Sequence, residues 1–260
     1  MSQPKERTVQ INGHPCRMWE KGEGKPLGYL AGYGGLPKWT PVLDKLAERR
    51  RVLAPSLPGY PGSLGHEELD TMLDWALATQ ELLETAGLDG GDLVGVSVGA
   101  ALAAEMAAIW GPAMVRKLVL VSPLGIYDDA EPLVDFFAVR PGTISGLLCA
   151  EADTFDDLTA CPPGADETEW RIEMVRASTA AARMLWPLCD TGVIKRLPRI
   201  HQDTLLLMGG EDRILPRSYA KRFTDAISGK SDVQVLPGAG HLADLDQPAA
   251  VAQAILTFCG

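Results

Sequence analysis

The sequence predicts a single α/β domain, a mostly parallel sheet with helices on both faces and one helical insertion. Up to residue 121, short apolar runs alternate with helical patterns, which is typical of βαβ units. The alternation stops between residues 123 and 196 and then resumes. At 260 residues the chain can bury a full core, and one domain with an insertion is more natural than two separate folds.

Each expected element follows from its own pattern. The strands are short apolar runs at residues 8–11, 16–20, 27–30, 52–54, 93–96, 117–121, 204–208 and 233–236. Asn12-Gly13 between the first two predicts a tight hairpin turn. The helices have apolar residues at helical spacing, at residues 39–48, 69–86, 98–109, 166–186, 216–227 and 248–258.

The helix expected at 166–186 dominates the insertion. Asp166 and Glu169 have capping-box spacing, with Asp in place of the usual Ser or Thr, and Pro187 ends the helix. An apolar stripe runs along it: Trp170, Met174, Ala177, Ala181 and Leu185. Such a stripe packs into the core or faces a pocket below it, and the sequence does not distinguish the two.

Composition excludes several classes of function. The net charge of -10 disfavours nucleic acid and anionic membranes, because both attract basic patches. The N-terminus lacks a signal peptide's apolar segment, and no apolar run approaches the roughly 18 residues that span a bilayer. Five scattered cysteines and four separated histidines indicate reduced thiols and no metal site. We expect a cytoplasmic protein with a small-molecule substrate and no cofactor; the sequence does not predict its oligomeric state.

The sequence 95–99, Gly-Val-Ser-Val-Gly, fits the nucleophile-elbow pattern Gly-x-Ser-x-Gly. An apolar strand precedes it and an alanine-rich helix follows, as the pattern requires. A sharp strand-to-helix turn would expose the Ser97 hydroxyl, and glycines at 95 and 99 avoid crowding that turn. The motif alone also fits an ordinary glycine-rich turn, so a catalytic role for Ser97 depends on finding its partner residues elsewhere in the chain.

A serine nucleophile needs a base, and the base needs an acid that orients it. Asp212 follows the strand at 204–208, and His241 follows the strand at 233–236. With Ser97 they stand beyond three strand ends in the chain order Ser, Asp, His. This pattern predicts a catalytic triad. Glu211 is a rival to Asp212 but falls one position early in the Gly-x-x-Asp pattern that starts at Gly209.

The chain resembles the α/β-hydrolase superfamily, in its cap-bearing group of bacterial esterase-like enzymes. The resemblance covers nearly the whole length and is strongest at residues 95–99, 209–216 and 238–248. It implies the α/β-hydrolase fold, a mostly parallel eight-stranded sheet flanked by helices, with a helical cap inserted after the sixth strand. The core would be residues 1–124 and 196–260, and the cap residues 125–195.

The resemblance also implies roles for individual residues. Ser97 would be the nucleophile, His241 the general base and Asp212 the orienting acid, with an oxyanion hole made by the backbone N–H groups of Val98 and Tyr33. Ala31 stands where the family usually has histidine before the oxyanion glycine. Because the oxyanion donor is a backbone group, this departure affects the shape of the loop more than the donor itself.

Among hydrolases of this type, the serine argues against epoxide hydrolases and haloalkane dehalogenases, which use aspartate as nucleophile. We expect a serine hydrolase of a small or medium carboxylic ester, lactone or thioester. A C–C bond hydrolase of the ring-cleavage-product type is the alternative, although that group typically has tryptophan after the catalytic histidine where this chain has Leu242. A perhydrolase-like side reaction and a non-catalytic ligand-binding homologue are further alternatives.

The cap should determine specificity, because its apolar side chains could line the substrate pocket and such pockets are mostly apolar. The residues expected at the substrate pocket are apolar or aromatic side chains of the insertion and of the position just before it, with one arginine that could pair with a substrate carboxylate but is more commonly a surface residue. They are Leu124, Phe136, Phe137, Trp170, Met174, Arg183 and Trp186.

Overall fold

One eight-stranded sheet forms the centre of the molecule. The computed structural model describes residues 3–88, 90–140 and 142–260; residues 1, 2, 89 and 141, which fall within predicted ranges, lie outside it. The strand order is β1-β2-β4-β3-β5-β6-β7-β8. The strands are β1 Lys5–Ile11, β2 His14–Lys21, β3 Pro26–Leu30, β4 Arg51–Pro55, β5 Asp92–Val96, β6 Leu118–Val121, β7 Thr204–Gly209 and β8 Ser231–Leu236. All eight predicted strands are therefore present, and the predicted fold class is confirmed.

The N-terminal hairpin supplies the antiparallel part of the sheet. Asn12 and Gly13 both have positive φ, 51° and 79°, as a tight hairpin turn requires. β1 pairs with β2 in the register Val9↔Cys16, and β2 pairs antiparallel with β4. From β4 onward every neighbouring pair is parallel. The carboxyl ends of these strands therefore meet at one edge of the sheet.

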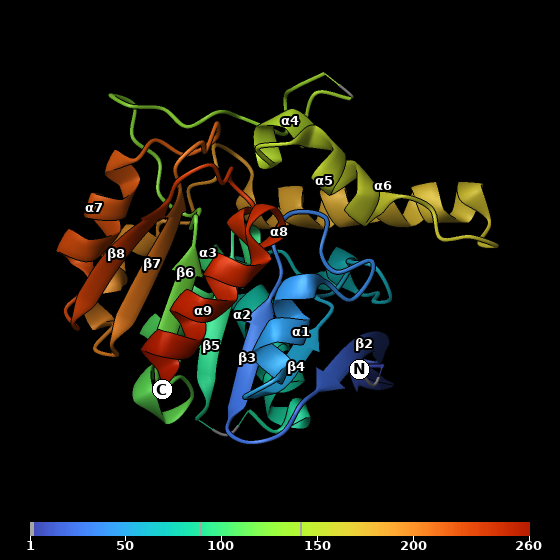
Figure 1. Cartoon of the computed structure of the whole chain (residues 1–260), viewed down its shortest axis with the longest axis horizontal. Helices are drawn as coiled ribbons and strands as arrows, with labels where there is room; N and C mark the ends of the chain where they lie inside the picture. The colour runs from blue at the N-terminus through green and yellow to red at the C-terminus, as the bar shows by residue number, and fades with distance from the viewer. Residues whose placement is uncertain (1–2, 89, 141) are drawn as a thin grey trace.

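Helices cover both faces. α1 Pro41–Ala47 packs against α9 Pro248–Cys259 on the face nearer the viewer in Figure 1, and α2 Met72–Ala86 packs with α3 Val98–Trp110 behind the sheet. The remaining helices of the core are α7 Ser218–Ala226 and α8 Ala243–Asp246. Short 3-10 helices are η1 His66–Glu68, η2 Gly111–Ala113, η3 Val193–Lys195 and η4 Leu197–Arg199.

Helix starts differ from the predicted ones by a few residues, for local reasons. α2 begins at Met72, three residues later than expected, because Thr71 and Asp74 form a reciprocal capping box at that point. α1 begins at Pro41, where the fixed φ of proline suits the first turn, and this leaves Trp39 outside the helix. Among the described residues, no helix is long and apolar enough to cross a membrane.

The insertion between β6 and β7 is helical, as expected. It contains α4 Ser145–Leu148, α5 Ala152–Thr159 and α6 Glu167–Leu185, which lie along the upper edge of the sheet in Figure 1. The Asp166 side chain accepts the N–H groups of Thr168 and Glu169, so the predicted N-cap is present.

The insertion lies directly on the loop after β8. The N–H of Leu242 donates to the carbonyl of Leu148 at 2.7 Å, and a Cβ built on Gly240 would stand 2.7 Å from the nitrogen of Ala150. Asp246 joins the two segments by accepting the N–H groups of Gly240 and Ala150. This contact brings the insertion onto the segment that carries His241.

Candidate active site

Ser97 lies at the junction of β5 and α3 in a strained backbone conformation. Its φ of 51° and ψ of -112° are unusual for a residue with a side chain. A Cβ at Gly95 would lie 2.4 Å from the carbonyl oxygen of Gly99, and a Cβ at Gly99 would lie 2.4 Å from the carbonyl oxygen of Leu30. Both distances are too short for any side chain, so the two glycines of the motif are required by the close packing of this turn.

The three residues predicted as a triad lie in hydrogen-bond contact. Nε2 of His241 is 2.8 Å from Oγ of Ser97, and Nδ1 of His241 is 2.9 Å from Oδ2 of Asp212. The histidine side chain is fully buried and that of Asp212 is 1% exposed. Residues far apart in the sequence therefore form one buried chain of polar contacts at the carboxyl edge of the sheet.

The environment of Asp212 determines which histidine nitrogen carries the proton. Burial raises the pKa of this carboxyl, but His241 and the backbone N–H groups of Ile214 and Leu215 outweigh it and bring the pKa below its usual value. An ionised carboxylate only accepts hydrogen bonds, so Nδ1 of His241 must donate. Nε2 is then left as the acceptor for the Ser97 hydroxyl. The rival Glu211 is exposed and takes no part in these contacts.

The two backbone groups expected to form an oxyanion hole lie close to Ser97. Val98 is the first residue of α3, so its N–H has no partner within the helix. A Cβ built on Gly32 would stand 3.3 Å from Cβ of Ser97, so the loop after β3 passes beside the serine just before Tyr33. In the described part of the chain, neither the Val98 nor the Tyr33 N–H donates a hydrogen bond. The two N–H groups therefore lie unpaired beside the serine, and their role as an oxyanion hole stays a prediction.

Two cavities lie under the insertion. The smaller, about 350 Å³, is lined by Trp170 and Met174; the larger, about 470 Å³, by Phe136, Phe137 and Trp186. Tyr33 lines both.

The apolar stripe of α6 divides between the two roles left open by the sequence. Ala177, Ala181 and Leu185 are buried in the core. Trp170 and Met174, at the other end of the helix, face the smaller cavity. The stripe is therefore core in its C-terminal half and cavity wall in its N-terminal half.

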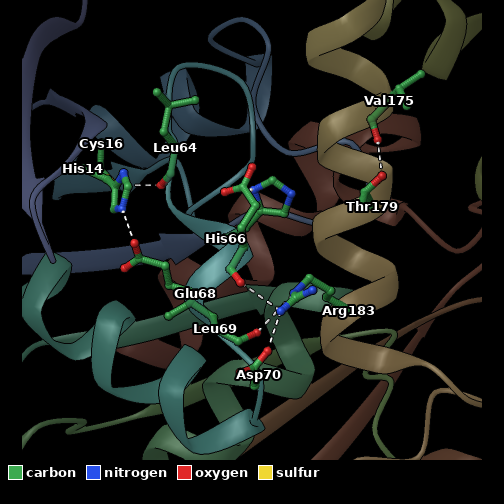
Figure 2. A network of polar contacts seen from close by, with 11 residues as sticks. His14, Cys16, Leu64, His66, Glu68, Leu69, Asp70, Val175, Thr179 and Arg183 are labelled. Atoms are coloured by element: carbon green, nitrogen blue, oxygen red, sulfur yellow. Dashed lines mark hydrogen bonds and ion pairs between the residues drawn. The ribbon is translucent and has the colours of Figure 1, made fainter.

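Two residues expected at the pocket lie elsewhere. Leu124 is fully buried just after β6 and lines neither cavity. Arg183 donates to the carbonyl oxygen of Glu67. Figure 2 shows that it also contacts the carbonyl oxygen of Leu69 and forms an ion pair with Asp70. Arg183 joins α6 to the segment before α2, which agrees with the surface role expected from the sequence as the more common one. That it meets a substrate carboxylate stays a prediction.

Ser178 is a cavity residue that sequence reasoning missed. It lines both cavities, and its Oγ accepts the Tyr33 hydroxyl at 2.9 Å. Trp170, Met174 and Ser178 are spaced by four residues, so the helical period of the stripe already pointed to this position. Ile144 and Phe155 also line the smaller cavity and were not expected there. Phe155 and Leu158 are the buried residues of α5 and are spaced by three, so a helical period existed at this position as well.

Comparison with known proteins agrees with this arrangement. Residues 12–254 match the model of a family described as the alpha/beta hydrolase family. A 2-hydroxy-6-oxo-2,4-heptadienoate hydrolase of Pseudomonas putida is 25% identical, over 93% of this chain and 91% of its own. Among solved structures, the esterase RhEst1 of Rhodococcus has a TM-score of 0.75 at 19% identity, covering 99% of this chain and 98% of its own. A meta-cleavage product hydrolase of Pseudomonas fluorescens has a TM-score of 0.77 at 16% identity, covering 97% and 96%.

Proposed function

The chain belongs to the alpha/beta hydrolase family, and we propose that it is a serine hydrolase that cleaves a small or medium carboxylic ester, lactone or thioester. The observation that carries this proposal is the buried series of contacts from Asp212 through His241 to Ser97, at 2.9 and 2.8 Å. A serine hydroxyl is a weak nucleophile unless a base removes its proton, and this geometry supplies the base and the acid that orients it.

The reaction proceeds through an acyl-enzyme. Nε2 of His241 takes the proton of Ser97 as Oγ attacks the substrate carbonyl carbon, and the N–H groups of Val98 and Tyr33 bind the resulting oxyanion. His241 then gives the proton to the leaving alcohol or thiol as the carbon–heteroatom bond breaks. A water molecule, deprotonated by His241, attacks the acyl-enzyme and releases the acid and free Ser97. Each oxyanion donor is expected to lower the barrier by about 2.7–4 kcal/mol.

The cavities support the stated substrate size. Volumes of about 350 and 470 Å³ lie within the range of small-molecule sites. Their walls are largely aromatic and aliphatic, with Tyr33, Phe136, Phe155 and Trp170 among them. An apolar acyl or alkyl group of moderate length suits these walls better than a highly charged one.

C–C bond hydrolysis is the second candidate. It is favoured by the similarity to the heptadienoate hydrolase of Pseudomonas putida, which extends over nearly the whole of both chains. The same serine, base and oxyanion donors serve such a reaction, with a carbanion in place of the alcohol as leaving group. Leu242, directly after His241, is the residue at which this chain departs from the pattern expected for that group.

A substrate panel separates the two candidates. Initial rates would be measured on p-nitrophenyl acetate, butyrate and octanoate and on 2-hydroxy-6-oxo-2,4-heptadienoate. An ester hydrolase gives an optimum in acyl length and little turnover of the dienoate, and the reverse result favours C–C cleavage. Hydrolysis of none of these by the folded protein would contradict the ester and the C–C candidates and leave lactones and thioesters as the substrates of the proposal.

Ser97→Ala must abolish the activity that the panel reveals. Ser122→Ala is its matched control, because Ser122 is also fully buried, also has a positive φ (44°) and follows the neighbouring strand β6. The expected result is loss of turnover in Ser97→Ala and retention in Ser122→Ala. Turnover that survives in Ser97→Ala would overturn the proposed nucleophile.

A further inference from the structure

The serine and the cavities are separated in this conformation. Ser97 and His241 are fully buried, and neither lines the cavities under the insertion. A substrate carbonyl must approach Oγ of Ser97 to within bonding distance, which a serine without exposed surface does not allow. Some group has to move before a substrate held in either cavity can react.

Tyr33 lies in the loop beside the serine and also lines both cavities. Its backbone follows Gly32, which lies against Ser97, and its side chain lines both hollows while being 8% exposed. Its ring contacts Phe136 of the larger cavity edge-on, at 5.4 Å between centroids, and Phe155 of the smaller one at 6.2 Å. The ring therefore stands as a wall between the two cavities.

A hydrogen bond holds this ring to α6. The Tyr33 hydroxyl donates to Oγ of Ser178 at 2.9 Å, and Oγ of Ser178 donates to the carbonyl of Met174 at 3.2 Å. Burial raises the pKa of Tyr33, so the hydroxyl keeps its proton and remains a donor. Burying a hydroxyl without a hydrogen-bond partner costs free energy, so this contact stabilises the observed position of the Tyr33 ring.

We propose that the side chain of Tyr33 is a gate over Ser97, latched shut by Ser178, and that it determines which substrate sizes reach the nucleophile. This proposal rests on the proposed function only in taking Ser97, which the gate covers, as the nucleophile. Rotation of the ring about its side-chain bonds breaks the bond to Ser178 and joins the cavities to the serine. The backbone N–H of Tyr33 keeps its place during this rotation, so the gate and the oxyanion donor are separable functions of one residue.

Two other contacts between α6 and the core supply a control. The Glu173 carboxylate accepts the N–H of Gly62 at 2.7 Å, and Arg183 donates to the carbonyl of Glu67 at 2.9 Å. Neither Glu173 nor Arg183 lines the cavities. Arg183→Gln therefore loosens α6 without touching Tyr33, which distinguishes a gate at Tyr33 from movement of the whole insertion.

The test measures access to position 97 without relying on catalysis by serine. In a Ser97→Cys background, the thiol is alkylated with iodoacetamide or with the bulky N-(1-pyrenyl)maleimide, and the modified peptide is quantified by mass spectrometry. Ser178→Ala, Tyr33→Phe, their combination and Arg183→Gln are compared. Peptide mapping keeps position 97 apart from Cys161, which is partly exposed.

We expect the bulky reagent to react about fivefold faster in Ser178→Ala and in Tyr33→Phe, because the loss of one neutral hydrogen bond changes the population of the open position by about that factor. The combined variant should be no faster than either single one, because both remove the same bond. Iodoacetamide should show a smaller gain, and Arg183→Gln none.

Unchanged rates in both single variants, additive gains in the combined one, or an equal gain in Arg183→Gln would each overturn the gate. A failure of the proposed function would give a different result. If the native protein shows no acylation of Ser97 while these variants still change access to position 97, the gate is supported and the nucleophile assignment is wrong. If Ser97 is acylated but the variants do not change access, the nucleophile assignment is supported and the gate is wrong.

Discussion

At Asp212, each carboxylate oxygen has a different task. Oδ1 accepts the N–H groups of Ile214 and Leu215, both at 2.9 Å, and Oδ2 faces Nδ1 of His241. The loop after β7 thus fixes the carboxylate, and the carboxylate in turn fixes the orientation of the imidazole ring. Through these contacts Asp212 determines that Nε2 of His241 is the nitrogen that faces Ser97 as an acceptor.

Asp212→Asn tests this division of tasks. The amide oxygen would replace Oδ1 on the two backbone donors, so the amide NH₂ would face Nδ1 and favour the histidine tautomer with its proton on Nε2. That tautomer cannot accept the Ser97 proton, and kcat should fall by about 10³–10⁴-fold. The measurement is kcat together with a thermal unfolding curve. A folded variant with native kcat would show that another carboxylate orients His241.

Asp244 makes a prediction about pH and stability. It is buried, accepts the Tyr29 hydroxyl at 2.6 Å, and burial raises its pKa to about 6 from a usual value of 3.8. Between these values the folded state holds more protons than the unfolded state, so the free energy of unfolding should decrease as pH rises through this window. The expected loss is about 3 kcal/mol.

Asp244→Asn should remove this decrease, because the amide does not titrate. Urea unfolding at several pH values between about 4 and 7 measures the effect. An equally steep decrease in the variant would place its origin at another group.

At the scale of elements, the junction of β5 and α3 depends on close backbone packing. α3 starts so near to β3 that the carbonyl oxygens of Leu30 and Ala31 stand 2.4 and 2.5 Å from a Cβ built on Gly99. The helix N-terminus and the loop that carries Tyr33 are thereby held side by side. The position of two proposed oxyanion donors thus follows from the absence of one side chain.

Gly99→Ala should therefore be severe and Gly146→Ala mild. At Gly99 the new methyl group would force α3 away from β3, at an expected cost of about 3–5 kcal/mol and with loss of activity. At Gly146, in α4, a Cβ meets nothing within 4 Å, so alanine should be neutral or slightly stabilising. Thermal unfolding and ester hydrolysis of both variants check this. A stable, active Gly99→Ala protein would refute the packing argument.

At the scale of the whole molecule, the core was predictable and the arrangement of the insertion was not. The strands are short runs of apolar residues bounded by turn residues, and Ser97, Asp212 and His241 follow three of them, so local patterns sufficed to predict the sheet and the site. The place of Arg183 depends on Asp70, more than a hundred residues earlier in the chain. No local sequence pattern predicts such a contact.

The dependence on contacts between distant residues also explains the other differences between the predicted and observed positions. Leu124 lies three residues after the end of β6, and only the packing of the insertion shows that it is core rather than cavity wall. The contact of Tyr33 with Ser178 joins the loop after β3 to α6 and likewise depends on the tertiary fold. Predicting these features requires the position of the short helices α4 and α5 on the core, which tertiary contacts determine.

Ser97 is the proposed nucleophile of a hydrolase. Mass spectrometry of the protein after incubation with a fluorophosphonate, which phosphonylates activated serines, tests this proposal. We expect one adduct, on the peptide that contains Ser97, with none in Ser97→Ala and much slower formation in His241→Ala. An adduct on another residue, or a folded protein that hydrolyses its substrate but remains unmodified, would contradict it.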